Sequence, residues 1–391
     1  MLNTPFSPWP SFTEEEISAV SRVMESGRVN YWTGTEGREF EKEFARFTDC
    51  NYAVAVSNGT VALDLALHAL GIGKGDEVIV TSRTFLASVS SIVLSGAKPV
   101  FADVDRDSQN ITAASILPLV SSRTKAIVCV HLAGWPCDMD PIMELAGECD
   151  IAVVEDCAQA HGARYKGRSV GSFGDVAAWS FCQDKIMTTG GEGGMVTTNR
   201  KDLWKKIWSY KDHGKSWEAV YEREHPPGFR WVHDAFGTNM RMTEMQAAIG
   251  RIQLHRMPEW TLRRQRAASA IDAAVAPYSS IRSPKPGDNI EHARYKHYLF
   301  VDPAHLAVGW DRDRIVAELG KLGVPCYQGS CSEVYLEACF EGTGFRPAER
   351  LPAAQELGET SLMFLVHPTL SDVEIDKTCE ALVSVLGTAS V

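Results

Sequence analysis

Short apolar runs alternate with helix-like segments through the first half of the chain, and this alternation constrains the fold more than any other feature. The runs predicted as strands are Ala53–Val56, Glu77–Thr81, Pro99–Asp103, Lys125–His131 and Ile151–Glu155. The segments predicted as helices are Thr13–Ser26, Gly34–Phe47, Thr60–Leu70, Phe85–Leu94 and Pro141–Ala146. Apolar strands separated by helices form parallel or mixed sheets that are covered on both faces. The sequence therefore predicts an α/β fold.

The pattern changes near residue 243. Thr243–Val275 is a long helix-like stretch, and Pro258 within it is expected to kink or divide the helix. The later predicted elements are a strand at Tyr298–Val301 and helices at Asp311–Leu322 and Ser371–Leu386. A chain of 391 residues also exceeds a typical single domain. We therefore predict a large α/β domain over residues 1–257 and a smaller C-terminal α+β domain over residues 258–391.

Charge and cysteine content argue against several classes of protein. The net charge is −11, whereas binding to nucleic acid or to an anionic membrane requires clustered basic charge. Ten cysteines are present without a CxxC spacing, so we expect reduced thiols and no metal site. The N-terminus does not resemble a signal peptide, and no apolar run approaches the ~20 residues of a membrane span. We expect a cytoplasmic protein with no nucleic-acid or membrane partner.

One lysine has an unusual setting. Lys185 lies in SFCQDKIMTTGGEGG (Ser180–Gly194), between the apolar run Val176–Phe181 and a glycine cluster. About thirty residues upstream, the run IAVVEDCAQ (Ile151–Gln159) ends in acid. A lysine amine for a Schiff base, together with an acid for a pyridinium nitrogen, is what pyridoxal phosphate (PLP) requires. The alternative is an ordinary surface lysine, against which stand the few nearby charges and the glycines.

Asp156 and Gln159 are the expected partners of the cofactor ring. Asp156 follows the predicted strand and could hold the protonated ring nitrogen, while Gln159 could hydrogen-bond the ring hydroxyl. Glu155 should point to the opposite side of the strand. The alternative is a capping aspartate and a solvent-facing glutamine.

The cofactor phosphate also has candidate ligands. Gly59 and Thr60 open a predicted helix, where free N–H groups and the helix dipole favour an anion. Ser180 could add a hydroxyl, and Asn239, just before the long helix, could donate an amide N–H. The alternative is an ordinary helix cap, both at the segment containing Gly59 and Thr60 and at Asn239. Phe85 could stack on the ring or pack in the core.

Taken together, these segments resemble the DegT/DnrJ/StrS family of PLP-dependent sugar aminotransferases. The matching stretches are NYWTGTEGREFEKEFA, SNGTVALDLAL, GDEVIVTSRTFLAS, GAKPVFADVD, HLAGWPCDMDPI, VEDCAQAHGARYKG, GSFGDVAAWSFCQDKIMTTGGEGGMVTTN, GTNMRMTEMQAAIG and HPTLSD. The resemblance implies a PLP fold-type I aminotransferase, with a mostly parallel central sheet covered by helices. Such enzymes are normally homodimers with active sites at the subunit interface.

The resemblance also implies residue roles. Lys185 would form the Schiff base, Asp156 would pair with the pyridinium nitrogen and Gln159 with the ring hydroxyl. The remaining matched positions are Gly59, Thr60 and Ser180 at the phosphate, Asn239 reaching that phosphate from the neighbouring subunit, and Phe85 on the ring.

The expected reaction moves an amino group from L-glutamate to a keto sugar, preferably a nucleotide-linked keto-deoxysugar, with pyridoxamine phosphate between the two halves. The product would serve amino-sugar and surface-polysaccharide (lipopolysaccharide) biosynthesis. Related 3-dehydratases carry His where this chain has Lys185, which favours a true aminotransferase. Arg83 could touch a substrate phosphate, and Arg241 could pair with substrate or be structural.

Three alternatives remain open. A cyclitol or a non-nucleotide keto sugar could be the acceptor, and nothing in the sequence separates these from a nucleotide sugar. A non-catalytic regulatory homologue is opposed by the intact Lys185, Asp156 and Gln159. A Rossmann dehydrogenase is opposed by the lack of a G-x-G-x-x-G between a first strand and helix.

Overall fold

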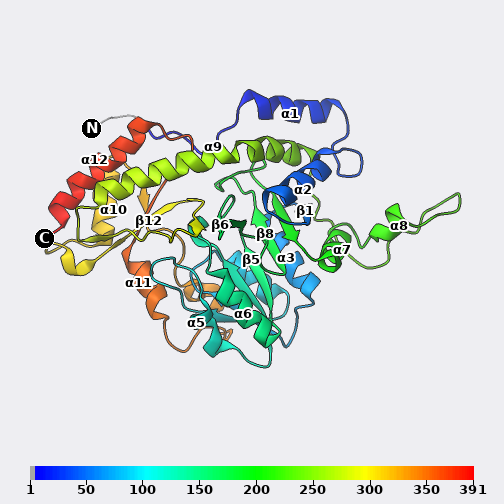
Figure 1. Ribbon diagram of the computed structural model, residues 1–391, viewed down its shortest axis with the longest axis horizontal. Helices are drawn as coiled ribbons and strands as arrows, with labels where there is room; N and C mark the ends of the chain where they lie inside the picture. Colours follow the sequence, from blue (N-terminus) through cyan, green and yellow to red (C-terminus); the bar gives the residue numbers. More distant parts are fainter. Residues whose placement is uncertain (1–4) are drawn as a thin grey trace.

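A seven-stranded sheet forms the centre of the protein in the computed structural model, which describes residues 5–391 (Figure 1). Its strands, in spatial order, are β1 (Tyr52–Val56), β9 (Gly194–Thr198), β8 (Val176–Ser180), β5 (Ala152–Asp156), β4 (Thr124–Val130), β2 (Glu77–Thr81) and β3 (Lys98–Ala102). β9 is antiparallel to both of its neighbours, and the pairs from β8 to β3 are parallel. The predicted α/β fold with a mostly parallel sheet is confirmed.

Helices cover both faces of this sheet. In chain order, the helices are α1 (Glu14–Glu25), α2 (Glu36–Phe47), α3 (Gly59–Leu70), α4 (Ala87–Leu94), α5 (Ala113–Ile116), α6 (Met139–Cys149), α7 (Lys201–Tyr210), α8 (Trp217–Tyr221), α9 (Glu244–Val275), α10 (Arg312–Lys321), α11 (Pro352–Thr360) and α12 (Asp372–Ala389). Successive strand residues point to opposite faces: Val154 packs with α3 and α4, whereas Val153 packs with α6. The apolar runs of the sequence are therefore buried on both sides.

The predicted elements lie within a few residues of the observed ones. Thr13 caps α1 in a reciprocal capping box with Glu16, as its position in the sequence predicts. The helix predicted from Phe85 begins two residues later, at Ala87. The short helix predicted at Pro141–Ala146 is longer in the structure, where α6 spans Met139–Cys149.

Pro258 does not divide the long helix, so the predicted division is wrong, whereas a kink at this position stays a prediction. α9 runs unbroken through Pro258 over 32 residues. Before the proline, Met257 is buried in a cluster with the helices of the large sheet; after it, Ile271 is buried in a separate cluster with α10 and α12. Burial on both sides of the proline offsets the hydrogen bond that it removes. The domain boundary near Pro258 stays a prediction.

The C-terminal part holds a second, antiparallel sheet. Its strands, in spatial order, are β10 (Ile281–Arg282), β12 (His297–Val301), β14 (Ser361–Phe364) and β13 (Cys326–Tyr327). A small third sheet joins β11 (Ile290–Glu291), β6 (Arg164–Tyr165) and β7 (Arg168–Ser169). The short 3₁₀ helices are η1 (Leu117–Leu119), η2 (Leu132–Gly134), η3 (Pro303–His305), η4 (Val334–Leu336) and η5 (Ala338–Phe340). Within residues 5–391, no helix combines the length and apolar character needed to cross a membrane.

The aromatic cluster beneath the large sheet supplies a test of the packing. The Phe44 ring is fully buried and contacts Phe40, Trp179 and Phe181. Phe44→Ala should lower the free energy of unfolding by about 3–5 kcal/mol, because it leaves a cavity among rigid rings. Urea denaturation measures the change, with the exposed Leu94→Ala as control. Equal effects of the two substitutions would contradict this account of the core.

Candidate functional site

A cavity of about 580 Å³ opens where several strands of the large sheet end. Its walls come from the segments that follow β1, β2, β5 and β8, including Thr60, Ser88, Asp156, Ser180 and Lys185. Because these strands run in the same direction, their carboxyl ends meet at one edge of the sheet. The topology thus brings together side chains that are far apart in the sequence.

One end of the cavity suits a phosphate. Gly59 and Thr60 form the first turn of α3, and the Asn58 side chain accepts the N–H of Val61 at 3.0 Å. The first N–H groups of a helix have no intrahelical partner and favour an anion. A Cβ added to Gly59 would lie 2.6 Å from the Cβ of Ser180. Glycine is therefore required for this close approach of α3 to the end of β8.

Asp156 and Gln159 line the middle of the cavity. Asp156 is 5% exposed, and its carboxylate accepts hydrogen bonds from Ser88 Oγ (2.8 Å) and from the N–H of Ala158 (3.1 Å). The Gln159 side-chain oxygen accepts the N–H of Ala133 at 2.8 Å. That bond fixes the amide orientation, so the NH₂ group remains available to donate to a ligand.

Lys185 stands at the other end of the cavity, on a loop after β8. The Lys185 carbonyl accepts the indole N–H of Trp9 at 2.8 Å, and its ammonium lies 5.3 Å from the centre of the Tyr295 ring. The Tyr295 hydroxyl in turn donates to Asp184 at 2.5 Å. Burial would raise the pKa of Asp184, but Lys185, the Tyr295 hydrogen bond and Lys296 outweigh burial and lower it. The carboxylate therefore stays ionised beside the lysine.

A second cavity, of about 600 Å³, adjoins the first. The two share Phe85, Gln159, Asp184 and Lys185. The other walls come from the C-terminal part, with Tyr295, Lys296, Tyr298, Tyr327, Ser330 and Glu337 among them. A molecule in this second space can therefore also reach Lys185.

The other predicted site residues lie in different surroundings. Phe85 is 69% exposed and faces both cavities, which excludes a purely core role. Asn239 is exposed on the surface and does not line either cavity of its own chain. Arg241 forms an ion pair with the buried Asp212, which favours its structural alternative.

Arg83 does not reach the substrate space, so the prediction that it touches a substrate phosphate is wrong. Its side chain is fully buried behind the cavity wall. The guanidinium donates to Gln109 (3.0 Å) and to Ser361 in β14 (2.9 Å). Arg83 thus ties the end of β2 to the second sheet.

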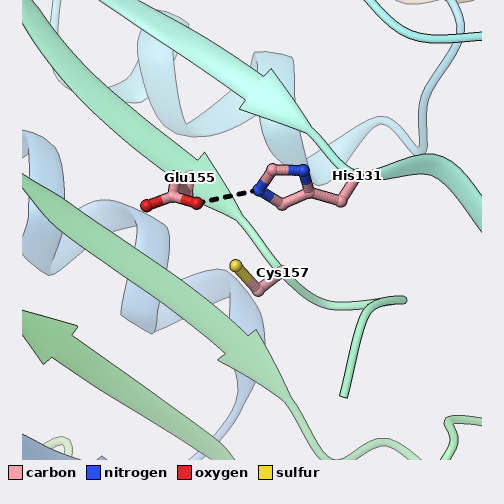
Figure 2. A group of neighbouring side chains, drawn as sticks. All are labelled: His131, Glu155 and Cys157. Atoms are coloured by element: carbon pink, nitrogen blue, oxygen red, sulfur yellow. Dashed lines mark hydrogen bonds and ion pairs between the residues drawn. The ribbon is translucent and has the colours of Figure 1, made fainter. Parts of the chain in front are cut away.

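Glu155 lies on the opposite face of β5 from Asp156, as the alternation of a strand predicts. Figure 2 shows its carboxylate facing the ring of His131, with Cys157 beside them. The His131 Nδ1 accepts the N–H of Cys137, so Nε2 donates to Glu155 at 3.0 Å. The same carboxylate accepts three backbone N–H groups, from Gly171, Phe173 and Gly174.

These bonds favour a structural role for the His131–Glu155–Cys157 group over metal binding. The carboxylate and both ring nitrogens already have partners. Burial, with Glu155 and Asp156 nearby, raises the pKa of the Cys157 thiol well above its ordinary value. A neutral thiol is a poor metal ligand.

Comparison with known proteins identifies the family. The model of the DegT/DnrJ/EryC1/StrS aminotransferase family matches residues 10–383. The chain belongs to this family. The protein is therefore an aminotransferase, and its cofactor is PLP. The cavity fits that group, because it combines an anion-binding helix start, a buried carboxylate and a lysine amine.

Individual relatives cover almost the whole chain. GDP-perosamine synthase from Escherichia coli O157:H7 is 35% identical over 376 residues, which is 95% of this chain and 96% of the relative. The crystal structure of an aminotransferase from Psychrobacter cryohalolentis is 60% identical, with a TM-score of 0.96 over 98% of this chain and 99% of that one. The PLP form of Spr1654 from Streptococcus pneumoniae, described as a sugar aminotransferase, is 28% identical, with a TM-score of 0.86 over 99% of both chains.

Sequence reasoning missed several residues of the site. Ser88, Tyr295 and Lys296 contact or flank the predicted residues, yet none follows a motif of its own. Tyr295 and Lys296 come from a segment just before β12, more than a hundred residues after Lys185. Only the packing of the C-terminal part against the large sheet reveals them.

The Glu155 network generates a stability prediction. Glu155→Ala should lower the free energy of unfolding by about 3–5 kcal/mol, because it leaves His131 and three backbone N–H groups unpaired. Burial raises the pKa of Glu155, but His131 and the N–H groups lower it below its ordinary value. Its stabilising contribution is thus present above the ordinary glutamate pKa and is lost as the pH falls through the folded-state pKa.

Urea denaturation at neutral pH checks this prediction, with Glu148→Ala on the exposed side of α6 as the control. If Glu155→Ala costs no more stability than the control, the carboxylate does not hold the strand end in the way described.

Proposed function

We propose that this protein transfers an amino group from L-glutamate to a nucleotide-linked keto sugar. The observation that carries the proposal is that Lys185 and Asp156 share one cavity, with a second cavity of similar size opening directly onto Lys185. The second space suits an acceptor larger than an amino acid. A relative named GDP-perosamine synthase supports a sugar nucleotide as that acceptor.

PLP, when bound, supplies an electron sink that lowers the barrier to proton removal from the amino-bearing carbon. The Lys185 amine would hold the cofactor, and its basic nitrogen would act as the proton carrier at the amino-bearing carbon. The Asp156 carboxylate keeps the ring nitrogen protonated. Its bond from Ser88 orients it, and its burial strengthens its pairing with a cation.

The other matched residues hold the cofactor in place. The N–H groups at Gly59 and Thr60, together with the Ser180 hydroxyl, would bind the phosphate. The Gln159 NH₂ group would donate to the ring oxygen, since its carbonyl oxygen already accepts the N–H of Ala133. Phe85, which lines both cavities, would contact the ring.

We also propose a homodimer in which Asn239 serves the partner's site. Asn239 is exposed and lies outside the cavity of its own chain. Nearby, α8 and the loop that follows it extend away from the body of the protein, at the right of Figure 1. Three aromatic side chains of this loop, Phe229, Trp231 and Phe236, are 77%, 79% and 100% exposed. Burial of these rings by a second copy would stabilise the dimer.

Lys185→Ala should abolish transamination while leaving the fold intact, because within residues 5–391 Lys185 is the only lysine that lines the same cavity as Asp156. Absorbance of the PLP-loaded protein is recorded before and after L-glutamate is added. The wild type should show a visible band that converts to the pyridoxamine form, and the variant should not convert. Lys321→Ala on the exposed face of α10 is the control. Turnover by Lys185→Ala would refute the assignment, and a wild-type band that ignores glutamate but responds to glutamine would change the donor.

Mixing two inactive variants tests the shared site. Asn239→Ala should lose most activity, and co-expression with Lys185→Ala should restore part of it. One site of each heterodimer then combines an intact lysine with an intact asparagine. Activity of purified, doubly tagged heterodimers is the measurement. If no activity returns, Asn239 acts within its own subunit or not at all.

A further inference from the structure

Lys296 is a cation without a fixed counter-ion inside the second cavity. It lies one residue before β12, and its side chain is half-buried and lines the cavity wall. Within residues 5–391 its ammonium makes no hydrogen bond or ion pair, and its close contact is the Tyr295 ring, 4.8 Å from the centroid. An ammonium removed from water with no anion beside it is costly.

The groups around Lys296 provide little negative charge to balance its ammonium. Asp184 is the acid that favours its charged form, but that carboxylate already accepts the Tyr295 hydroxyl and lies beside Lys185. The other charged or titratable groups near it, or lining the same cavity, are Arg264 of α9, His367, Lys185, Tyr298, Tyr327, Cys331 and Glu337. Two of these groups, Arg264 and Lys185, are cations, and their positive charge disfavours the protonated form of Lys296.

The same ring connects both lysines. Lys185 lies 5.3 Å from the centre of the Tyr295 ring, and Lys296 contacts that ring as well. Both lysines also line the second cavity, so a substrate that occupies this space can contact both of them. In the proposed reaction, the donor and the acceptor both carry oxyanions and occupy this space in turn.

We propose that the Lys296 ammonium binds an oxyanion of the substrate, either a carboxylate of the amino donor or a phosphate of the nucleotide-linked acceptor. This inference rests on the proposed function, since it concerns the same site. A charge-assisted hydrogen bond to an oxyanion would supply the counter-ion that the protein itself lacks. Lys296 is then a specificity-determining residue that the large domain does not provide.

Unreactive probes separate the two oxyanions. Glutarate has the carboxylates of the donor without its amine, and GDP, UDP and dTDP have the phosphates of an acceptor without its sugar. Calorimetric titration of the PLP-loaded protein gives a dissociation constant for each probe. Lys296→Met should weaken the binding of glutarate or of a nucleotide by about tenfold or more. The probe that is affected identifies the source of the oxyanion.

The pH dependence provides a second readout. Burial, together with Arg264 and Lys185, lowers the pKa of Lys296 to about 8 even though Asp184 opposes the shift. The ammonium is therefore charged below that pH and neutral above it, so wild-type affinity should fall as the pH rises past about 8. Lys296→Arg keeps its charge and should retain affinity across this range. A structural role for Lys296 would not produce this difference.

Lys321→Met is the matched control, because this lysine is exposed and pairs with Glu318 away from both cavities. Unchanged affinity of every probe in Lys296→Met, or no binding of any probe to the wild type, would overturn the proposal. So would a loss of thermal stability with no change in affinity. Failure of the proposed function is distinguishable, since it appears as a wild-type protein whose absorbance does not respond to an amino donor.

Discussion

A single buried carboxylate, that of Glu155, fixes the end of the strand on which the site depends. It joins the ring of His131 at the end of β4 to three backbone N–H groups in the turn before β8. The network thereby links three adjacent strands: β5 itself, the residue that follows β4 and the turn that precedes β8. Because neighbouring residues of a strand face opposite ways, fixing Glu155 on one side directs Asp156 into the cavity on the other. Two acids adjacent in sequence thus face opposite ways, Glu155 into a buried hydrogen-bond network and Asp156 into the cavity.

Most of the seven-stranded sheet and its helices could be predicted because their signals are local. Apolar runs with flanking helices predict a parallel sheet. Asp156 ends β5, and Gly59 and Lys185 lie in the segments that follow β1 and β8, so one edge of the sheet gathers them. Other features depend on packing that sequence does not display. The strand β9 was not predicted, since its GMVTT sequence begins with glycine and is not mainly apolar. Lys296 joins the site only through the docking of the C-terminal part.

The two cavities meet at a boundary formed by residues of different origin. Asp184 and Lys185 belong to the loop after β8, whereas Tyr295 comes from the segment before β12. The Tyr295 hydroxyl holds the Asp184 carboxylate and its ring lies beside the Lys185 ammonium. The first cavity is lined mainly by segments at the strand ends, and most of the remaining walls of the second cavity come from the C-terminal part. Under the proposed function, changes in the C-terminal part would alter substrate choice more than cofactor binding.

The first residues of the described chain connect distant parts of the protein. The Ser7 hydroxyl donates to Glu374 of α12 at 3.0 Å, and the Trp9 ring stacks on His367 while its indole N–H holds the Lys185 carbonyl. This segment spans from the C-terminal helix to the loop of the reactive lysine. Trimming the chain ahead of α1, by a protease or by design, would release that loop although the cut lies far from it in sequence. Residues 7–9 thus support the loop that carries Lys185, although they lie far from it in the sequence.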